Sequence, residues 1–149
     1  TDFLKLDAEN RALGLAGERA VVALERRSLE RLGLDRLARQ VEHVSQTRGD
    51  GLGFDVLSFA PDGAEKYIEV KTTRKQKEFP FLVTRNEVEL SIEERDRFHL
   101  YRVFDFGRST AGLYALKGAM DATCRLEPTA YAARPVLPRP SVGGELRAS

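Results

Sequence analysis

Three charged residues near the middle of the chain have types and spacing that suit phosphate chemistry. Glu69 and Lys71 lie two positions apart in an apolar run with Ile68 and Val70, and Asp55 begins an earlier apolar run. Residues i and i+2 of a strand share a face, so burying Ile68 and Val70 turns Glu69 and Lys71 away from the core. Two carboxylates held close together repel unless a proton or a cation lies between them. Mg²⁺ prefers oxygen ligands and needs only one or two protein carboxylates, while an adjacent lysine can orient or deprotonate an attacking water.

A hairpin is the element that must bring these residues together. We expect strands over residues 54–60 and 66–73, joined at Pro61-Asp62-Gly63, because Pro presets φ and Gly permits a positive φ. A turn centred there places Asp55 opposite residues 69–71, although a slip of one residue would move it to the other face. Both faces of the first of these strands are largely apolar, so we expect it to be central in its sheet.

The remaining elements follow from hydrophobic period and capping residues. Thr84 and Glu87 form a T-x-x-E capping box, which predicts a helix after Thr84. Gly14 and Gly17 fall inside the first helix, where each costs about 1 kcal/mol, and indicate either a frayed start or a close approach by another element. The expected helices and strands are a helix over 10–32 ended by Gly33, a strand over 40–45, a loop over 46–53, and strands over 98–106 and 112–116. We expect Glu25 of this helix to be solvated and His43 of the strand over 40–45 to be packed or exposed.

This order of elements predicts an α/β (α+β) domain in which a mixed central β-sheet is flanked by helices. The pattern fails from Glu127 onward, where proline and glycine are frequent. We therefore expect a folded domain over residues 1–126 and a Pro/Gly-rich tail over residues 127–149.

Net charge, cysteine content and the lengths of the apolar runs exclude some classes of protein. The 149 residues carry a formal net charge of +1, so overall charge gives no argument for nucleic acid or an anionic membrane. Cys124 is the single cysteine, which excludes an internal disulfide and a Cys-rich zinc site and suits a reducing, cytoplasmic setting. No apolar run approaches the roughly 20 residues of a membrane span, and no signal peptide is visible. The chain begins with Thr1, so we expect it to be a piece of a longer protein.

Several of these motifs coincide with those of a known superfamily. Gly53-Phe54-Asp55-Val56 followed by Ile68-Glu69-Val70-Lys71-Thr72-Thr73 resembles the core motif of the PD-(D/E)XK superfamily of Mg²⁺-dependent nucleases. More narrowly, the chain is similar to the domain named after the C-terminal region of the plant protein NO VEIN, over about residues 9–131. The motifs that carry this second resemblance are Gly14, Gly17 and Glu18 on the helix, Thr84-x-Asn86-Glu87, and Leu100-Tyr101-x-Val103.

The resemblance implies roles for four residues and a restriction-endonuclease-like core. Asp55 and Glu69 match the metal-binding acids, Lys71 matches the catalytic lysine, and Glu18 matches a helix glutamate near the metal. Phe54 occupies the position before the aspartate, where the PD-(D/E)XK motif has proline. The implied cofactor is Mg²⁺ or Mn²⁺, and the implied partner is DNA, with RNA not excluded. Members of the narrower family look like parts of bacterial defence, restriction or helicase-linked proteins, so other domains or subunits are expected partners.

Alternatives stay open at this point. A bare Glu-x-Lys is more often a solvated hairpin face, and Glu18 can be a surface glutamate. Arg74, Lys75 and Lys77 can hold phosphates or form a solvated loop, and Asn86 can reach the site from a helix start or be a polar first-turn residue. The main hypothesis is a Mg²⁺-dependent DNA nuclease domain; the other is an inactive nucleic-acid-binding or protein-docking module on the same fold.

Overall fold

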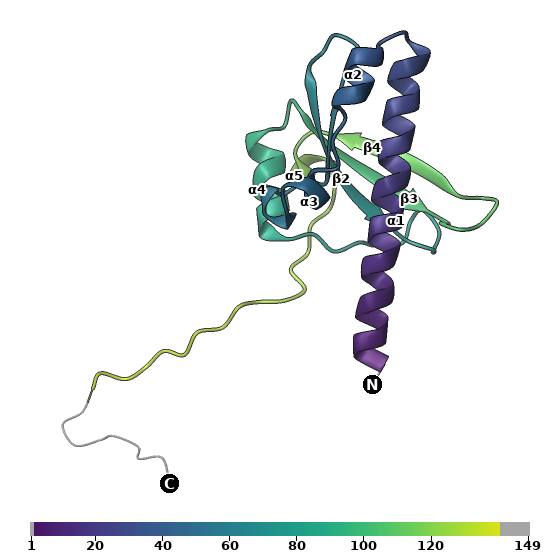
Figure 1. The fold of residues 1–149 in the computed structure, drawn as a ribbon. Helices are drawn as coiled ribbons and strands as arrows, with labels where there is room; N and C mark the ends of the chain where they lie inside the picture. Colours follow the sequence, from purple (N-terminus) through teal and green to yellow (C-terminus); the bar gives the residue numbers. More distant parts are fainter. Residues whose placement is uncertain (1, 141–149) are drawn as a thin grey trace.

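The computed structural model describes the backbone of residues 2–140 and the side chains of residues 9–140 (Figure 1). A small mixed sheet carries one long helix on one face and shorter helices around the rest. In chain order the elements are α1 (Asp2–Arg31), α2 (Asp35–Gln40), α3 (Val44–Thr47), the 3₁₀ helix η1 (Asp50–Leu52), β1 (Val56–Phe59), β2 (Glu65–Thr72), α4 (Arg85–Glu93), β3 (Phe98–Phe104), β4 (Gly112–Lys117) and α5 (Met120–Thr123).

The sheet has the order β1-β2-β3-β4 and mixes two kinds of pairing. The β1–β2 and β3–β4 pairs are antiparallel hairpins, whereas β2 and β3 run parallel. Parallel neighbours need a long crossover, and the segment that contains α4 supplies it. The expected α+β domain with a mixed sheet is therefore confirmed.

The expectation that the strand at residues 54–60 is central was wrong, because β1 is the edge strand beside β2. Its apolar character has another cause. The residue Glu42 forms a bridge with Leu57, each backbone N–H donating to the other's carbonyl at 2.9 Å. The segment before α3 thus covers the outer edge of β1, while α1 and α2 pack against the strand.

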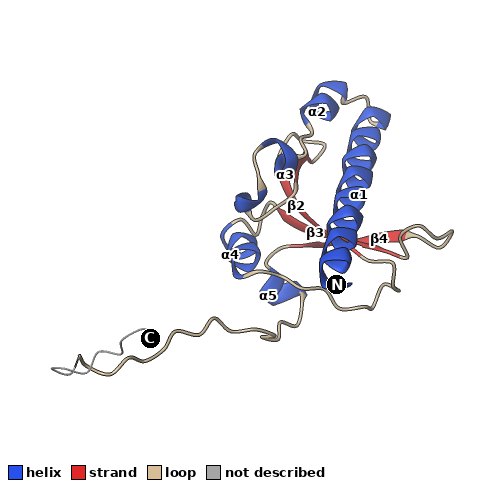
Figure 2. Ribbon diagram, turned by 60° about the horizontal axis from the view of Figure 1, so that its bottom comes forward, coloured by secondary structure: helices blue, strands red, loops and turns tan. Residues whose placement is uncertain are grey.

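Two apolar clusters lie on opposite faces of the sheet. One joins α1 to the sheet through Val21, Leu29, Ile68 and Val70. The other places Phe98, Leu100 and Met120 under α4 and α5. Figure 2 shows α1 crossing the strands on one side, with α4 and α5 grouped away from it. Alternation along β2 explains this division, since Ile68 and Val70 face α1 while Glu69 and Lys71 face the other way.

The first helix is longer than predicted and ends where predicted. It begins at Asp2 rather than near residue 10, and Gly33 stops it with φ of 75°. The Gly33 N–H donates to Glu30 O at 2.9 Å, and the Leu34 N–H to Leu29 O at 2.9 Å. These bonds close the C-terminus of α1 and turn the chain into α2.

The predicted strand over residues 40–45 was wrong. Gln40 ends α2, residue 42 makes only the isolated bridge, and Val44 starts α3. Val41 and Val44 are both buried, three positions apart, which suits a turn of helix better than one face of a strand.

The predicted turn and the predicted cap are both confirmed. Ala60 N donates to Ala64 O at 2.8 Å around Gly63, whose φ is 90°. Thr84 caps α4 with both bonds of the capping box. After α5 the chain forms no helix or strand as far as Pro140. Within the part of the chain that the structure describes, no helix has the length and apolarity to cross a membrane.

Candidate active site

The carboxyl groups of Asp55 and Glu69 meet on one face of the β1–β2 hairpin. Val56 pairs with Ile68, so Asp55 stands opposite Glu69 at the position just before β1. The Asp55 N–H donates to Ile68 O at 2.8 Å, and its Oδ2 accepts the Val70 N–H at 2.8 Å. The predicted register is confirmed, and it is held by the backbone of β2.

Both carboxyl groups bind protons more tightly than usual. Burial, together with the charge of Glu18, raises the pKa of Asp55 to about 6, although the Val70 N–H, Glu69 and Lys71 act to lower it. Burial also raises the pKa of Glu69 well above its ordinary value, and the charges of Asp55 and Glu87 add to this. Glu69 is only 4% exposed. Ionisation of both acids together is therefore unfavourable, and a cation bound between them would offset their repulsion.

Lys71 lies between two carboxylates. Its Nζ is 3.4 Å from Glu69 Oε1 and 2.9 Å from Glu87 Oε1. Burial lowers the pKa of Lys71, but the charges of Glu69 and Glu87 outweigh burial and raise it overall. Lys71 is therefore an ammonium at neutral pH, which suits hydrogen-bond donation and charge neutralisation rather than proton abstraction.

Glu18 reaches this region from α1. Its Oε1 accepts hydrogen bonds from Ser45 Oγ at 2.6 Å and from His43 Nε2 at 2.7 Å. Its charge raises the pKa of Asp55, which places the two carboxylates in electrostatic contact. Glu18 is therefore held in one orientation rather than free on the surface.

A cavity of about 290 Å³ opens onto the two central acids, lined by Asp50, Gly53, Phe54, Asp55, Glu69, Thr84, Asn86 and Glu87. Asn86 lies at its rim in the first turn of α4, and its Nδ2 donates to Gly51 O at 3.2 Å. Gly53 has φ of 82°, and a side chain there would meet Leu90. The glycine loop and the start of α4 thus form the walls of a groove over Asp55 and Glu69.

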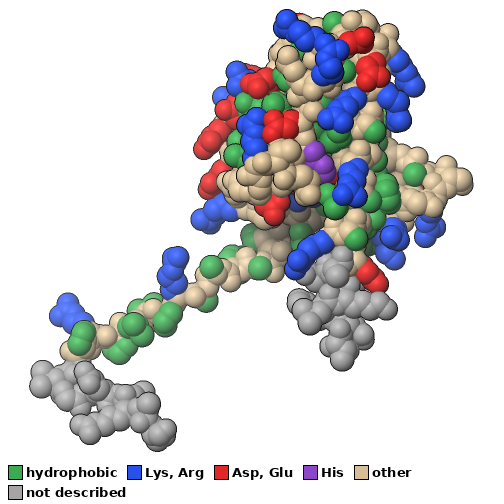
Figure 3. Space-filling view, viewed as in Figure 1, with side chains coloured by type: hydrophobic (Ala, Val, Ile, Leu, Met, Phe, Trp, Pro, Cys, Tyr) green, Lys and Arg blue, Asp and Glu red, His purple; other side chains and the backbone are tan. Residues whose placement is uncertain are grey.

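The predicted basic residues lie elsewhere. Arg74, Lys75 and Lys77 follow β2 in the linker to α4, and Arg74 and Lys75 line a separate cavity beside the first turns of α1. The space-filling view shows Asp and Glu side chains gathered over α4, with Lys and Arg side chains along the lower margin of the body (Figure 3). The structure therefore does not bring these three residues to the acid pair.

Three residues of this site escaped the sequence reasoning. Glu87 was assigned only to the cap of α4, yet one of its oxygens accepts both the Thr84 N–H and Lys71 Nζ. His43 was expected to be packed or exposed in a strand, and Ser45 was not singled out. The capping box could have drawn attention to Glu87. No local pattern points to the contacts that His43 and Ser45 make with a helix 25 or more residues away.

The residues present fit a hard divalent cation. Among the described residues, no three acidic, histidine or cysteine side chains converge as a complete metal site. Mg²⁺ keeps most of its water ligands and takes one or two carboxylates, which is what the Asp55–Glu69 pair offers. Both acids have raised pKa values, so a positive charge placed beside them would stabilise their ionised forms.

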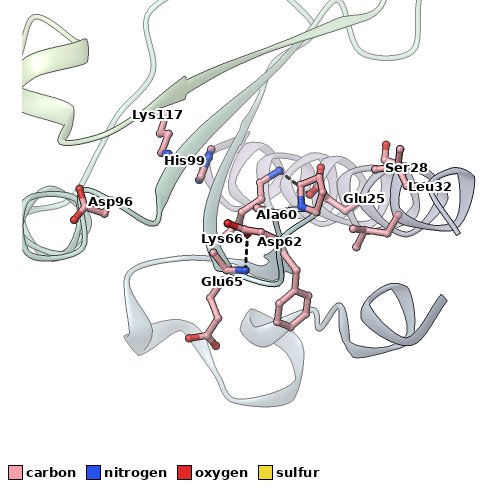
Figure 4. Close-up of a pocket in the computed structure, with 14 residues that line it drawn as sticks. Glu25, Ser28, Leu32, Ala60, Asp62, Glu65, Lys66, Asp96, His99 and Lys117 are labelled. Atoms are coloured by element: carbon pink, nitrogen blue, oxygen red, sulfur yellow. Dashed lines mark hydrogen bonds and ion pairs between the residues drawn. The ribbon is translucent and has the colours of Figure 1, made fainter. Parts of the chain in front are cut away.

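A second cavity of about 440 Å³ lies on the α1 side of the sheet, toward the hairpin turn (Figure 4). Glu25, which was expected to be solvated, is 6% exposed here. Its carboxylate accepts from Ser58 Oγ at 2.8 Å, Lys66 Nζ at 2.9 Å and Tyr101 Oη at 2.9 Å. Figure 4 shows Lys66 turned toward Glu25. Because these partners satisfy Glu25, we assign it to packing of α1 on the sheet.

Comparison with known proteins gives one match. The model of the family described as "Protein NO VEIN, C-terminal" matches residues 17–116, about two thirds of the chain. No curated protein and no solved structure matches significantly. The matched range includes Glu18, Asp55, Glu69, Lys71 and Glu87.

Proposed function

The chain belongs to the family of the NO VEIN C-terminal domain, and we propose that it is a divalent-metal-dependent nuclease domain of the PD-(D/E)XK type that hydrolyses DNA phosphodiester bonds. One observation carries the proposal: Asp55 and Glu69 line one groove, Asp55 accepts the Val70 N–H, and Lys71 Nζ lies 3.4 Å from Glu69 Oε1. A restriction-endonuclease-like core is part of the proposal.

Asp55 and Glu69 would hold Mg²⁺ or Mn²⁺, with Glu18 assisting from α1. Such an ion supplies Lewis-acid activation of a water and neutralises charge on the phosphate. The two acids suit this role because they are adjacent, poorly solvated and short of positive charge.

Lys71 positions the attacking water and stabilises negative charge that develops on the phosphate. Glu69 and Glu87 keep its ammonium charged and restrict its position. A preorganised charge of this kind costs little reorganisation at the moment of reaction. The role is electrostatic, so of the two functions open to the lysine, positioning of the water is favoured over its deprotonation.

His43 and Ser45 act through Glu18 as positioning residues. Each donates to the same oxygen of Glu18, which leaves the other oxygen free of these two bonds. Groups that orient a metal-site carboxylate commonly matter almost as much as the carboxylate itself. We place the domain in a larger protein of restriction, defence or DNA processing, whose other parts add DNA affinity to a domain of net charge +1.

The test is cleavage of plasmid and single-stranded DNA in Mg²⁺ or Mn²⁺ by the wild type and by Lys71→Ala. The proposal predicts metal-dependent nicking or degradation that the substitution abolishes, with the variant still folded by circular dichroism. DNA binding without cleavage in both proteins would instead support the inactive module.

A further inference from the structure

The linker between β2 and α4 presents an aromatic ring to solvent beside unpaired positive charges. Phe79 is 43% exposed, and it follows Arg74, Lys75 and Lys77 in the chain. Among the described side chains, those of residues 9–140, none of these three cations forms an ion pair. An exposed ring amid unpaired cations is the pairing that single-stranded nucleic-acid sites use, because the ring stacks a base while the cations hold phosphates.

The position of Phe79 is fixed by a buried charge. Arg102 of β3 is 2% exposed, and its Nη2 donates to Phe79 O at 2.9 Å and to Pro80 O at 3.4 Å. Its guanidinium also lies 5.0 Å from the centre of the Phe81 ring. Burial of a guanidinium without a carboxylate is costly. This arginine instead fixes the backbone of the linker and thereby the direction in which Phe79 projects.

The linker and α1 enclose two adjoining cavities. One of about 540 Å³ is lined by residues that include Glu9, Asn10, Arg74, Lys75 and Phe79. The other, of about 360 Å³, shares Asn10 and Phe79 with the first and extends to Lys71. Through these shared residues the two cavities form one groove that runs from Lys71 to the Phe79 ring. We refer to it as the Phe79 groove.

The end of β2 lines this groove, because Val70, Lys71 and Thr72 contribute to its wall. The N–H of Thr73 donates to Val103 of β3, whereas Ile68 O and the Val70 N–H bond Asp55 on the opposite side. By alternation the backbone polar groups of Thr72 turn toward that same side, beyond the start of β1, whose pairing with β2 stops at Val56 and Ile68. Gly14 of α1 faces open space with no atom within 4 Å of a built Cβ, so the groove stays clear next to Lys71.

We infer that the Phe79 groove binds an unpaired nucleotide, with its base stacked on Phe79 and its phosphates beside Arg74 and Lys75. Asn10 and Glu9 supply polar atoms for the edge of the base. A base inside a duplex already has neighbours on both faces and cannot stack on a protein ring unless it is extruded. The substrate class is therefore single-stranded nucleic acid, or a duplex with an unpaired segment. That the groove holds a strand for cleavage rests on the proposed function.

The test is binding by fluorescence anisotropy in EDTA, so that no cleavage occurs. The probes are a fluorescein-labelled single-stranded DNA oligonucleotide, an RNA oligonucleotide of the same sequence, and the DNA duplex. The inference predicts that the wild type binds a single strand more tightly than the duplex. Phe79→Ala should weaken binding of that strand by roughly 5- to 100-fold, the effect of one lost stacking contact, and leave duplex binding unchanged. Phe79→Tyr should retain affinity.

Three further variants separate stacking from other effects. Leu113→Ala removes an apolar residue of similar exposure, 38%, from β4, and should bind as the wild type does. Lys75→Gln should reduce the slope of log affinity against log salt by about 0.7, the value for one phosphate contact with a single strand. Phe79→Leu should behave like Phe79→Ala, because leucine lacks a π face.

Tighter binding of the duplex, or wild-type affinity in Phe79→Ala or in Phe79→Leu, would overturn the inference. These results are independent of catalysis. Phe79-dependent binding without any cleavage in Mg²⁺ would refute the proposed nuclease activity but support nucleotide binding by the Phe79 groove. Lys71-dependent cleavage without any effect of Phe79 on binding would support the nuclease activity and refute nucleotide binding by the Phe79 groove.

Discussion

Gly17 of α1 packs directly against the side chain of Thr72 in β2. A Cβ built on Gly17 would lie 2.8 Å from the Cβ of Thr72, closer than real side chains approach. Rotation of Thr72 cannot relieve this contact, because its Cβ does not move with χ1. The helix can therefore lie this close to the strand only with glycine at position 17, and the charge of the next residue, Glu18, acts on Asp55.

Substitution of this glycine should cost stability. Gly17→Ala must push α1 away from β2, and overpacking of this kind costs about 1–3 kcal/mol. Gly14→Ala is the matched control, because nothing lies within 4 Å of its built Cβ, and alanine should stabilise the helix by about 0.5–1 kcal/mol. Urea unfolding of the two variants measures both effects. Equal stability of the two proteins would show that the contact with Thr72 is unimportant.

The buried acid pair predicts an unusual dependence of stability on pH. The pKa of Asp55 is about 6 in the folded protein, above its ordinary 3.8, so the folded state binds the proton more tightly. The stability that protonated Asp55 contributes is therefore fully present below its pKa in the unfolded chain, and it is lost as pH rises through about 6. For Asp55 alone the loss is up to about 3 kcal/mol.

Metal-free protein should therefore become less stable between pH 5 and pH 8, and Mg²⁺ should restore stability at pH 8. Glu69→Gln removes one charge of the pair, so its stability should change less over this range and gain less from Mg²⁺. Thermal unfolding with EDTA or with Mg²⁺ provides the measurement. A wild type that is more stable at pH 8 than at pH 5 in EDTA would contradict this account of the pair.

His43 should affect activity through Glu18. His43→Phe keeps a ring but removes the bond to Glu18 Oε1, and hydrogen bonds to charged groups contribute about 1.5–3 kcal/mol. We expect the Mg²⁺ concentration for half-maximal cleavage to rise by about 10-fold or more. His99→Phe is the control, because His99 lines the cavity around Glu25 instead. Equal effects of the two substitutions would argue against a positioning role.

Glu87 should set the alkaline limit of activity. Glu87→Gln preserves the capping box, which accepts glutamine at this position, but removes one carboxylate that raises the pKa of Lys71. The lysine then loses its proton at lower pH, so the alkaline limb of the pH–rate profile should move to lower pH. An unchanged profile would show that the charge of Lys71 does not govern the rate.

Local patterns in the sequence predicted much of the fold. The stop at Gly33, the turn at Gly63 and the cap at Thr84 each depend on one or two residues with a strong backbone preference. The register that sets Asp55 opposite Glu69 followed from the length of the turn. Such features need no knowledge of distant parts of the chain.

The errors arose where distant contacts decide the structure. Val41 and Val44 are buried against other elements, and this packing, not local propensity, makes their segment a bridge and a helical turn. Glu25 is buried because partners from β1, β2 and β3 converge on it. The link between Glu87 and Lys71 depends likewise on how the α4 crossover returns to the sheet.

The most direct test of the central claim is single-turnover cleavage of labelled DNA by wild type and Asp55→Asn, started by addition of Mg²⁺. If Asp55 holds the catalytic metal, cleavage by the wild type requires Mg²⁺, and Asp55→Asn slows it by more than about 100-fold, since even outer-shell changes cost about 10- to 100-fold. Cleavage at the wild-type rate by a folded Asp55→Asn, or no cleavage by the wild type at any Mg²⁺ concentration, would contradict the nuclease assignment.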